Sequence, residues 1–94
     1  MSKQFYVVVY DIPNDRRRTR LYNTLQDFGT PVQYSVFECL LDANEYAQLK
    51  ARVARIIKPR ADHVRYYRLC AACQRSIETT GGPEQLQDDP VIIV

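Results

Sequence analysis

One stretch of the sequence decides the fold: Phe5-Tyr6-Val7-Val8-Val9-Tyr10-Asp11-Ile12-Pro13-Asn14-Asp15-Arg16-Arg17-Arg18. Its first six residues are β-branched or aromatic, which predicts a strand in the middle of a sheet. Asp11 ends this strand, and Asn14 is a good cap for a helix that starts with arginines. A carboxylate at a strand end, beside an arginine-rich helix start, can hold a hard cation against a phosphate. The stretch therefore indicates phosphodiester chemistry or phosphate binding, with nucleic acid as the first partner to consider.

The residues that follow predict a small α+β domain. The first helix is expected to run to Phe28 and to stop at Gly29, with Pro31 just beyond. Residues 32–41 are rich in β-formers and contain neither Gly nor Pro. Asp42 and Glu45 form a capping-box pattern for a second helix that Pro59 ends. Residues 63–70 read as a strand and residues 76–80 as a possible short one.

The order of these elements suggests a known plan. If residues 32–41 form two strands, the order is βαββαβ, which is the ferredoxin-like sandwich. Residues 1–80 would then form this domain, and residues 81–94 a linker and tail after the break at Gly81-Gly82-Pro83. The tail contains Val91, Ile92 and Ile93 and is too apolar for a free terminus. We expect it to add an extra strand to a sheet edge of its own or of a second subunit.

Size and composition narrow the class of protein. At 94 residues the chain forms one domain with a small core, so dimerisation would help its stability. No apolar run approaches the roughly 20 residues of a membrane span, and the N-terminal residues do not resemble a signal peptide. We therefore expect a cytoplasmic protein with no membrane association. Residues 1–60 carry ten Lys/Arg and six Asp/Glu, a net +4, whereas residues 61–94 carry three and five, a net −2. This asymmetry favours a local anion-binding face.

Two motifs resemble a known family. They are Tyr10-Asp11-Ile12-Pro13 with Asp15-Arg16-Arg17-Arg18, and then Val32-Gln33-Tyr34-Ser35-Val36-Phe37-Glu38. In their order and separation they resemble the second CRISPR-associated adaptation protein, Cas-two, over roughly residues 4–80. The resemblance implies a ferredoxin-like protomer, with one short strand near 32–34 and another at 36–41. It also implies a homodimer whose first strands end opposite each other. Family members are described as metal-dependent endonucleases on single-stranded RNA or double-stranded DNA, and as the central bridge to the integrase Cas-one.

The resemblance also implies functional residues. The catalytic and metal-binding aspartate falls on Asp11, with Mg²⁺ as the cofactor and Mn²⁺ as an alternative. The nucleic-acid-binding residues fall on Arg16, Arg17, Arg18, Arg20 and Ser35. Tyr10 is expected at the dimer interface, and the apolar tail residues Val91, Ile92 and Ile93 are expected at the dimer or partner interface because of their composition. The family often has an arginine where this chain has Pro31, so no phosphate contact is expected there.

Each of these residues also has a structural alternative. Asp11 can cap a turn or the following helix with its side chain. Arg17 and Arg18 flank the apolar stripe of the helix and can pack against it, whereas Arg16 and Arg20 face solvent and are better phosphate ligands. The tyrosines and Phe37 can be core or interface residues, although Tyr6, Tyr10, Tyr22 and Tyr34 can also stack bases.

The cysteines and the histidine do not indicate a separate site. Cys70 and Cys73 form a CxxC, but Cys39 and His63 do not complete a zinc spacing. A redox role requires the CxxC to open a helix after a strand in a thioredoxin-like βαβ context. We expect reduced thiols that pack locally and a surface histidine.

Four functions remain at this stage. The first is a dimeric CRISPR adaptation protein with metal-dependent endonuclease activity at Asp11. The alternative is a non-catalytic dimeric scaffold that bridges DNA and integrase subunits. An RNA-recognition module is disfavoured, because the third strand lacks its Gly-Phe-rich signature. A toxin-like RNase on the same fold stays open.

Overall fold

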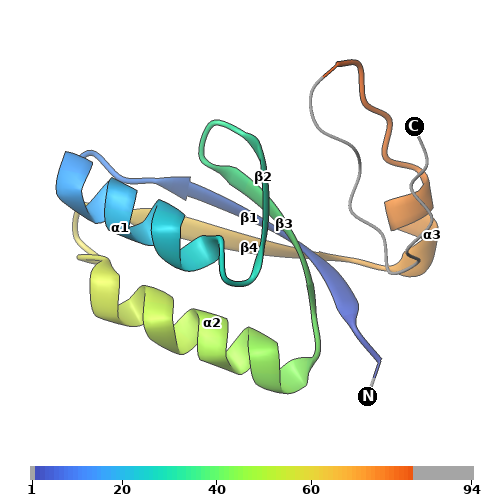
Figure 1. The fold of residues 1–94 in the computed structure, drawn as a ribbon, viewed down its shortest axis with the longest axis horizontal. Coiled ribbons are helices and arrows are strands. Elements are labelled where there is room, and N and C mark those ends of the chain that lie inside the picture. The colour runs from blue at the N-terminus through green and yellow to red at the C-terminus, as the bar shows by residue number, and fades with distance from the viewer. Residues whose placement is uncertain (1, 82–94) are drawn as a thin grey trace.

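The computed structural model describes residues 2–81. It consists of one sheet with two helices on one side (Figure 1). The elements follow the order β1 (Gln4–Asp11), α1 (Asp15–Leu25), β2 (Gly29–Gln33), β3 (Val36–Leu41), α2 (Ala43–Ile56), β4 (His63–Leu69) and α3 (Ala71–Arg75). The first six elements are the predicted βαββαβ plan, so the ferredoxin-like fold is confirmed. Within the described part of the chain, no helix has the length and apolar character needed to cross a membrane.

The sheet is antiparallel, with the strand order β2-β3-β1-β4. The predicted strand β1 is central, because it pairs with β3 on one side and with β4 on the other. Successive side chains of a strand point to opposite faces. In β1, Val8 and Tyr10 therefore point toward the helices, whereas Val9 and Asp11 point toward the face that carries no helix. We call that second face the open face.

The core lies between the sheet and the two helices. Leu21 and Leu25 of α1 and Leu49 of α2 are fully buried against Val8 of β1. Burying each such side chain contributes about 1.5–3 kcal/mol, so this layer supplies most of the stability of a small domain. Two aromatic contacts reinforce it: Tyr6 stacks on Tyr46 with 4.1 Å between the ring centroids, and Tyr46 meets Tyr66 edge-on.

Both helix starts agree with the sequence. The Asn14 side chain accepts a hydrogen bond of 2.9 Å from the backbone N–H of Arg17 and so caps α1. Asp42 and Glu45 form the predicted capping box of α2, with bonds of 2.8 and 2.9 Å. Such caps contribute about 1 kcal/mol each, because they satisfy backbone N–H groups that have no partner inside the helix.

The end of α1 differs from the prediction. The helix stops at Leu25 rather than at Phe28, and the backbone N–H groups of Asp27 and Phe28 bond back three residues in a tight turn. β2 then begins at Gly29 and includes Pro31. A proline is tolerated there because β2 is an edge strand, and the pairing with β3 shifts register between Pro31 and Gln33.

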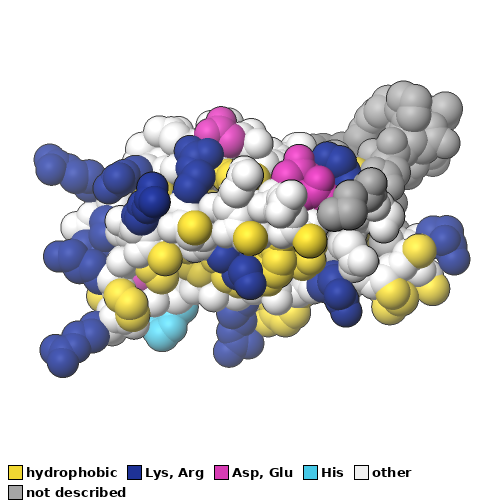
Figure 2. Space-filling view, turned by 90° about the horizontal axis from the view of Figure 1, so that it is seen from below, with side chains coloured by type: hydrophobic (Ala, Val, Ile, Leu, Met, Phe, Trp, Pro, Cys, Tyr) yellow, Lys and Arg dark blue, Asp and Glu magenta, His cyan; other side chains and the backbone are white. Residues whose placement is uncertain are grey.

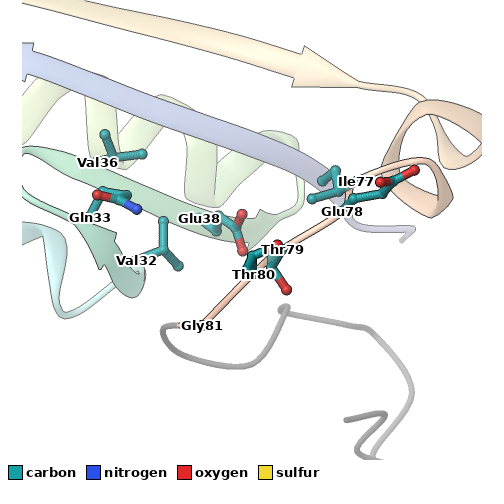
Figure 3. A pocket seen from close by; sticks show the side chains of 9 residues that line it. All are labelled: Val32, Gln33, Val36, Glu38, Ile77, Glu78, Thr79, Thr80 and Gly81. Atoms are coloured by element: carbon teal, nitrogen blue, oxygen red, sulfur yellow. The ribbon is translucent and has the colours of Figure 1, made fainter.

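Two further differences follow β4. A short helix, α3, occupies residues that the sequence left unassigned, and the structure has no strand at residues 76–80. The chain after α3 instead lies beside β2 and β3, where the two enclose a cavity of about 330 Å³ (Figure 3). The Glu38 side chain of β3 points into this cavity toward Thr80. The predicted tail strand, with Val91, Ile92 and Ile93, lies outside the described residues.

Candidate phosphodiester site

Asp11 is an exposed carboxylate at the end of β1. The structure gives the capping of α1 to Asn14, and Asp11 has no hydrogen bond or ion pair from its side chain within residues 2–81. The structure therefore does not support the alternative in which Asp11 caps the helix. A carboxylate that is exposed and has no protein partner is available for a cation.

Arg18 holds the loop between β1 and α1 in place. Its guanidinium donates a hydrogen bond of 2.9 Å to the carbonyl oxygen of Ile12 and forms an ion pair with Asp15. The hydrogen bond to Asp15 raises the pKa of Arg18 above its ordinary value. Arg18, which the sequence offered as a nucleic-acid ligand, is thus used largely to shape the loop that follows Asp11.

Arg17 is engaged in the same way, but with a distant partner. Its Nε and Nη2 donate to the two carboxylate oxygens of Asp62 at 2.7 and 3.1 Å, and the Asp62 side chain has no exposed surface. The backbone N–H of Lys58 donates a third hydrogen bond, of 2.8 Å, to Asp62. The Arg17 guanidinium is the main reason why the pKa of Asp62 lies below its usual range. This pair fixes α1 to the loop between α2 and β4.

Arg16 and Arg20 differ from their neighbours. Both are exposed, and neither has a hydrogen bond or ion pair within the described residues. They were the better phosphate candidates of the four arginines, and their surroundings agree with that reading. Unpaired guanidinium groups are free to bind phosphate oxygens in a two-pronged manner.

The fold adds two further cations to the same end of the molecule. Lys58 and Arg60 lie in the loop before β4, which the Arg17–Asp62 pair joins to α1, and both are exposed. Lys and Arg side chains gather at this end, which is on the left in Figures 1 and 2. We refer to Arg16, Arg20, Lys58 and Arg60 as the basic end. Lys58 and Arg60 were not predicted to join this group, because they are about 40 residues from α1 in the chain.

His63 was predicted as a surface histidine, and it is exposed, but its place beside Asp11 was not predicted. It is the first residue of β4 and pairs directly with Asp11 across the two strands. Directly opposed residues have Cβ atoms about 4.5–5.5 Å apart and share a face. The βαββαβ plan itself contained the signal, because its last strand runs antiparallel to the first and starts where the first one ends.

A divalent cation fits the donors at this position. Mg²⁺ keeps several waters and often takes only one or two protein carboxylates, and an exposed, unpaired Asp11 offers one per protomer. Mn²⁺ also accepts imidazole nitrogen, which His63 offers alongside. Residues 2–81 contain no cluster of three or more His, Cys, Asp or Glu residues that would form a closed cage. A cation held by Asp11 would therefore keep most of its waters.

Tyr10 and Ser35 lie elsewhere. Strand alternation turns Tyr10 toward the helices, where its side chain is buried in the protomer and only 5% exposed. Its place at a dimer or partner interface stays a prediction. Burial raises the pKa of Tyr10, and the neighbouring Tyr22 adds to this effect. Ser35 follows β2 with a left-handed backbone, φ 63°, and its carbonyl oxygen accepts a hydrogen bond of 3.1 Å from the Tyr10 backbone. Ser35 therefore belongs to a pocket on the helical side of β1, away from the face that carries Asp11.

The cysteines do not contribute to this site. Cys39 is buried against the helices, and desolvation raises the pKa of its thiol to about 12. Cys70 caps α3 by accepting a hydrogen bond of 3.4 Å from the Cys73 backbone, which lowers the pKa of Cys70. Both thiols of the CxxC are free and exposed, and the motif does open a helix after a strand.

Comparisons with known proteins identify the family of this chain. Residues 4–77 match the family model described as CRISPR associated protein Cas2. The chain is similar to a CRISPR-associated endoribonuclease Cas2 of Chloroflexus aurantiacus, with 42% identity over 92 residues that cover 94% of this chain and 99% of the relative. Among solved structures it is similar to a hypothetical protein from Thermus thermophilus, with a TM-score of 0.78 and 40% identity over 86% of this chain and 95% of the other.

A second solved structure places the fold in a larger assembly. It is a partial Cas6-RT-Cas1–Cas2 complex, one chain of which matches with a TM-score of 0.72 and 26% identity over 81% of this chain and 89% of the other. The predicted family is confirmed by the span of the family match and by the identity to full-length relatives. The chain belongs to the family of the CRISPR associated protein Cas2.

Proposed function

We propose that this chain is an endonuclease of CRISPR adaptation that cleaves single-stranded RNA or double-stranded DNA with a divalent cation at Asp11. Its relatives are named CRISPR-associated endoribonucleases and endonucleases, which supports the reaction class. The observation that carries the proposal is the exposed, unpaired Asp11 carboxylate beside the cations of the basic end.

The protein's own residues divide the work between binding and hydrolysis. Arg16, Arg20 and Lys58 would bind the phosphates on either side of the scissile bond, which positions the strand without reading its sequence. Asp11 would hold Mg²⁺, or Mn²⁺ with help from His63. The bound cation would supply charge neutralisation at the phosphate and a water of lowered pKa.

A homodimer would complete the site. The open face carries apolar side chains, among them Val7 and Val9, and the large exposed ring of Tyr67. A second copy packed on this face would cover that apolar surface, which a small domain needs for stability. Because Asp11 lies at the end of the same face, a two-fold axis there would bring two carboxylates together, and two carboxylates are a common protein complement for Mg²⁺.

A non-catalytic role as a bridge is the second candidate. The match to one chain of a Cas1–Cas2 complex supports it, because it indicates that this fold can assemble with the integrase Cas-one. In this role the basic end would hold DNA, and Asp11 would not be needed. Binding and assembly without cleavage would distinguish the bridge from the enzyme.

Cleavage assays with an Asp11→Asn variant separate the two candidates. We expect wild type to cut single-stranded RNA or duplex DNA with Mg²⁺ and to be inactive with EDTA. Asp11→Asn keeps the shape of the side chain but loses the charge that holds the cation, so we expect at least a 100-fold slower reaction, about 2.7 kcal/mol in the barrier.

The matched control is Asp27→Asn. Asp27 is also an exposed carboxylate, but it lies in the turn after α1, away from the end of β1. There it forms an ion pair with Arg52 of α2. Its loss should leave cleavage unchanged. If Asp11→Asn cuts as fast as wild type and as Asp27→Asn, the enzymatic role of Asp11 is wrong and only the bridging role remains.

A further inference from the structure

A second concave feature lies on the helical side of β1, next to the basic end. It is a pocket of about 220 Å³ between the start of α1, the end of β1 and the turn that joins β2 to β3. Three tyrosines and four polar side chains line it: Tyr10, Tyr22, Tyr34, Arg18, Thr19, Gln33 and Ser35. Its volume is below the roughly 300–1,000 Å³ of pockets for drug-sized ligands, so it suits one small planar group.

The outer walls of the pocket are aromatic and accessible. Tyr34 is 81% exposed and Tyr22 is 38% exposed, although rings of this size are normally buried. Tyr22 is fixed by an edge-on contact with Phe37, with 5.3 Å between the ring centroids. Tyr34 is held outward by its turn, because the left-handed backbone of Ser35 and its bond to the Tyr10 backbone set the course of the chain.

Arg18 adds a flat cationic surface to the pocket. Its guanidinium is anchored by its bonds to the Ile12 carbonyl and to Asp15, so its plane has a fixed orientation. Bases stack on guanidinium planes as they do on tyrosine rings. The Gln33 amide and the Ser35 hydroxyl can donate and accept hydrogen bonds at the edge of a ring.

We propose that this pocket receives one nucleobase of a single-stranded nucleic acid, stacked on Tyr34 and held beside Arg18. Exposed aromatic walls, a fixed guanidinium and edge hydrogen-bonding groups are the combination that binds unstacked bases. The bases of a duplex are paired and stacked, and would have to be flipped out to enter.

The inference rests on the proposed function and specifies its substrate class. Tyr10 lines the pocket and Asp11 follows it in β1 with its side chain on the opposite face, so the phosphates of a strand whose base occupies the pocket would pass around the end of β1 to reach Asp11. There the basic end can hold those phosphates. The pocket therefore favours single strands, whereas the basic end binds single strands and duplexes alike.

Fluorescence of a 2-aminopurine base within an otherwise uniform pyrimidine single strand tests the pocket. The titration is done with the full chain in EDTA, so that no cleavage takes place. We expect wild type to quench the probe, because a stacked 2-aminopurine loses its emission. Tyr34→Leu keeps an apolar side chain but removes the aromatic ring, so we expect at least about fivefold weaker binding of the single strand and loss of quenching.

The controls separate stacking from charge. Tyr34→Phe keeps the ring and should restore both affinity and quenching. A duplex of the same sequence should bind Tyr34→Leu as well as wild type. The double variant Arg16→Ala/Arg20→Ala should bind both forms more weakly but quench the probe fully at saturation.

Two results would overturn the inference. One rejects the base pocket alone, and the other also rejects the proposed function. If Tyr34→Leu binds and quenches the single strand like wild type, the base pocket is wrong while the proposed endonuclease stands. If wild type binds neither the single strand nor the duplex, the proposed function fails and the pocket fails with it. Because Tyr34 is 81% exposed, its replacement leaves the core intact, which a thermal melt of each variant verifies.

Discussion

Adjacent arginines of α1 have opposite roles because of the helical repeat. Arg17 and Arg18 lie beside the buried stripe of the helix, and each binds a carboxylate of the protein, Asp62 and Asp15. Arg16 and Arg20 are four residues apart, so they lie on one face of the helix, and that face is exposed to solvent. The first pair shapes the site, and Arg18 also lines the proposed base pocket, whereas the second pair is left for the phosphates of the substrate.

The Arg17–Asp62 pair gives a prediction about stability and pH. Asp62 has no exposed side-chain surface, and its replacement by Asn leaves Arg17 without its charged partner. We expect Asp62→Asn to lower the melting temperature by roughly 5–10 °C at about pH 7. Because the pKa of Asp62 is lowered in the folded state, its stabilisation is present above the ordinary value of about 3.9 and is lost as the pH falls below it.

Thermal melts at two pH values measure this effect. The difference between wild type and Asp62→Asn should be largest near neutral pH and should shrink toward about pH 3. Asp27→Asn is the matched control, because Asp27 and Arg52 form an ion pair that is largely exposed and contributes little. A gap between wild type and Asp62→Asn that grows on acidification would contradict the assignment.

At the scale of elements, Gly29 shows why the end of α1 was misplaced. A glycine after an amphipathic stretch usually ends a helix, and the sequence was read in that way. In the structure Gly29 serves a different purpose, since it lets β2 approach β3 closely. A Cβ atom at this position would lie 2.3 Å from the Glu38 carbonyl oxygen and 2.5 Å from the Cys39 sulfur.

Gly29→Ala should therefore destabilise the sheet. The closest atom belongs to the backbone of a central strand pair and cannot move away, so β2 would have to shift. We expect a loss of about 1–3 kcal/mol in the free energy of unfolding, which chemical denaturation measures. Thr30→Ala, one residue along in the same strand, adds no atom and should cost less; equal losses for the two variants would refute the steric argument.

Elements with strong local patterns were predictable and the others were not. The apolar run of β1, the Asn14 cap and the Asp42–Glu45 capping box each depend on neighbours in the sequence, and all three are observed. α3 was missed, because its five residues are too few to show a helical repeat. The burial of Tyr10 could have been predicted from the sequence, because alternation along a strand turns Tyr10 and Asp11 to opposite faces.

The whole molecule assembles the basic end from segments that are distant in the sequence. Arg16 and Arg20 belong to α1, whereas Lys58 and Arg60 precede β4, and the sheet brings the two segments together. The sequence alone identifies Asp11 and the two arginines of α1, which are close together in the chain. It does not identify Lys58 and Arg60 as their neighbours. The place of His63 beside Asp11 was not predicted for the same reason, because it exists only once β4 pairs with β1.

The basic end predicts how binding depends on salt. Arg16→Ala/Arg20→Ala should weaken binding uniformly across sequences and reduce the slope of log K against log salt by about 2 for duplex DNA. Lys58→Ala/Arg60→Ala should act in the same way. Filter binding or fluorescence anisotropy at several salt concentrations gives the slope.

A control variant that loses two positive charges elsewhere tests whether the position of the charges at the basic end matters. Arg68 and Arg75 are exposed in the second half of β4 and in α3, at the other end of the molecule. Arg68→Ala/Arg75→Ala removes two charges and should leave the slope close to that of wild type. Equal slopes for all three double variants would mean that overall charge, and not the basic end, governs binding.

The two edge strands of the sheet, β2 and β4, differ in how well their free backbone groups can pair with an additional strand. β2 lacks one backbone donor at Pro31 and is kinked between Pro31 and Gln33, so its free side is a poor template for hydrogen bonding. β4 runs without proline from His63 to Leu69. A fifth strand, from this chain or from another, would therefore pair with β4 rather than with β2. The sheet can be extended at one edge only.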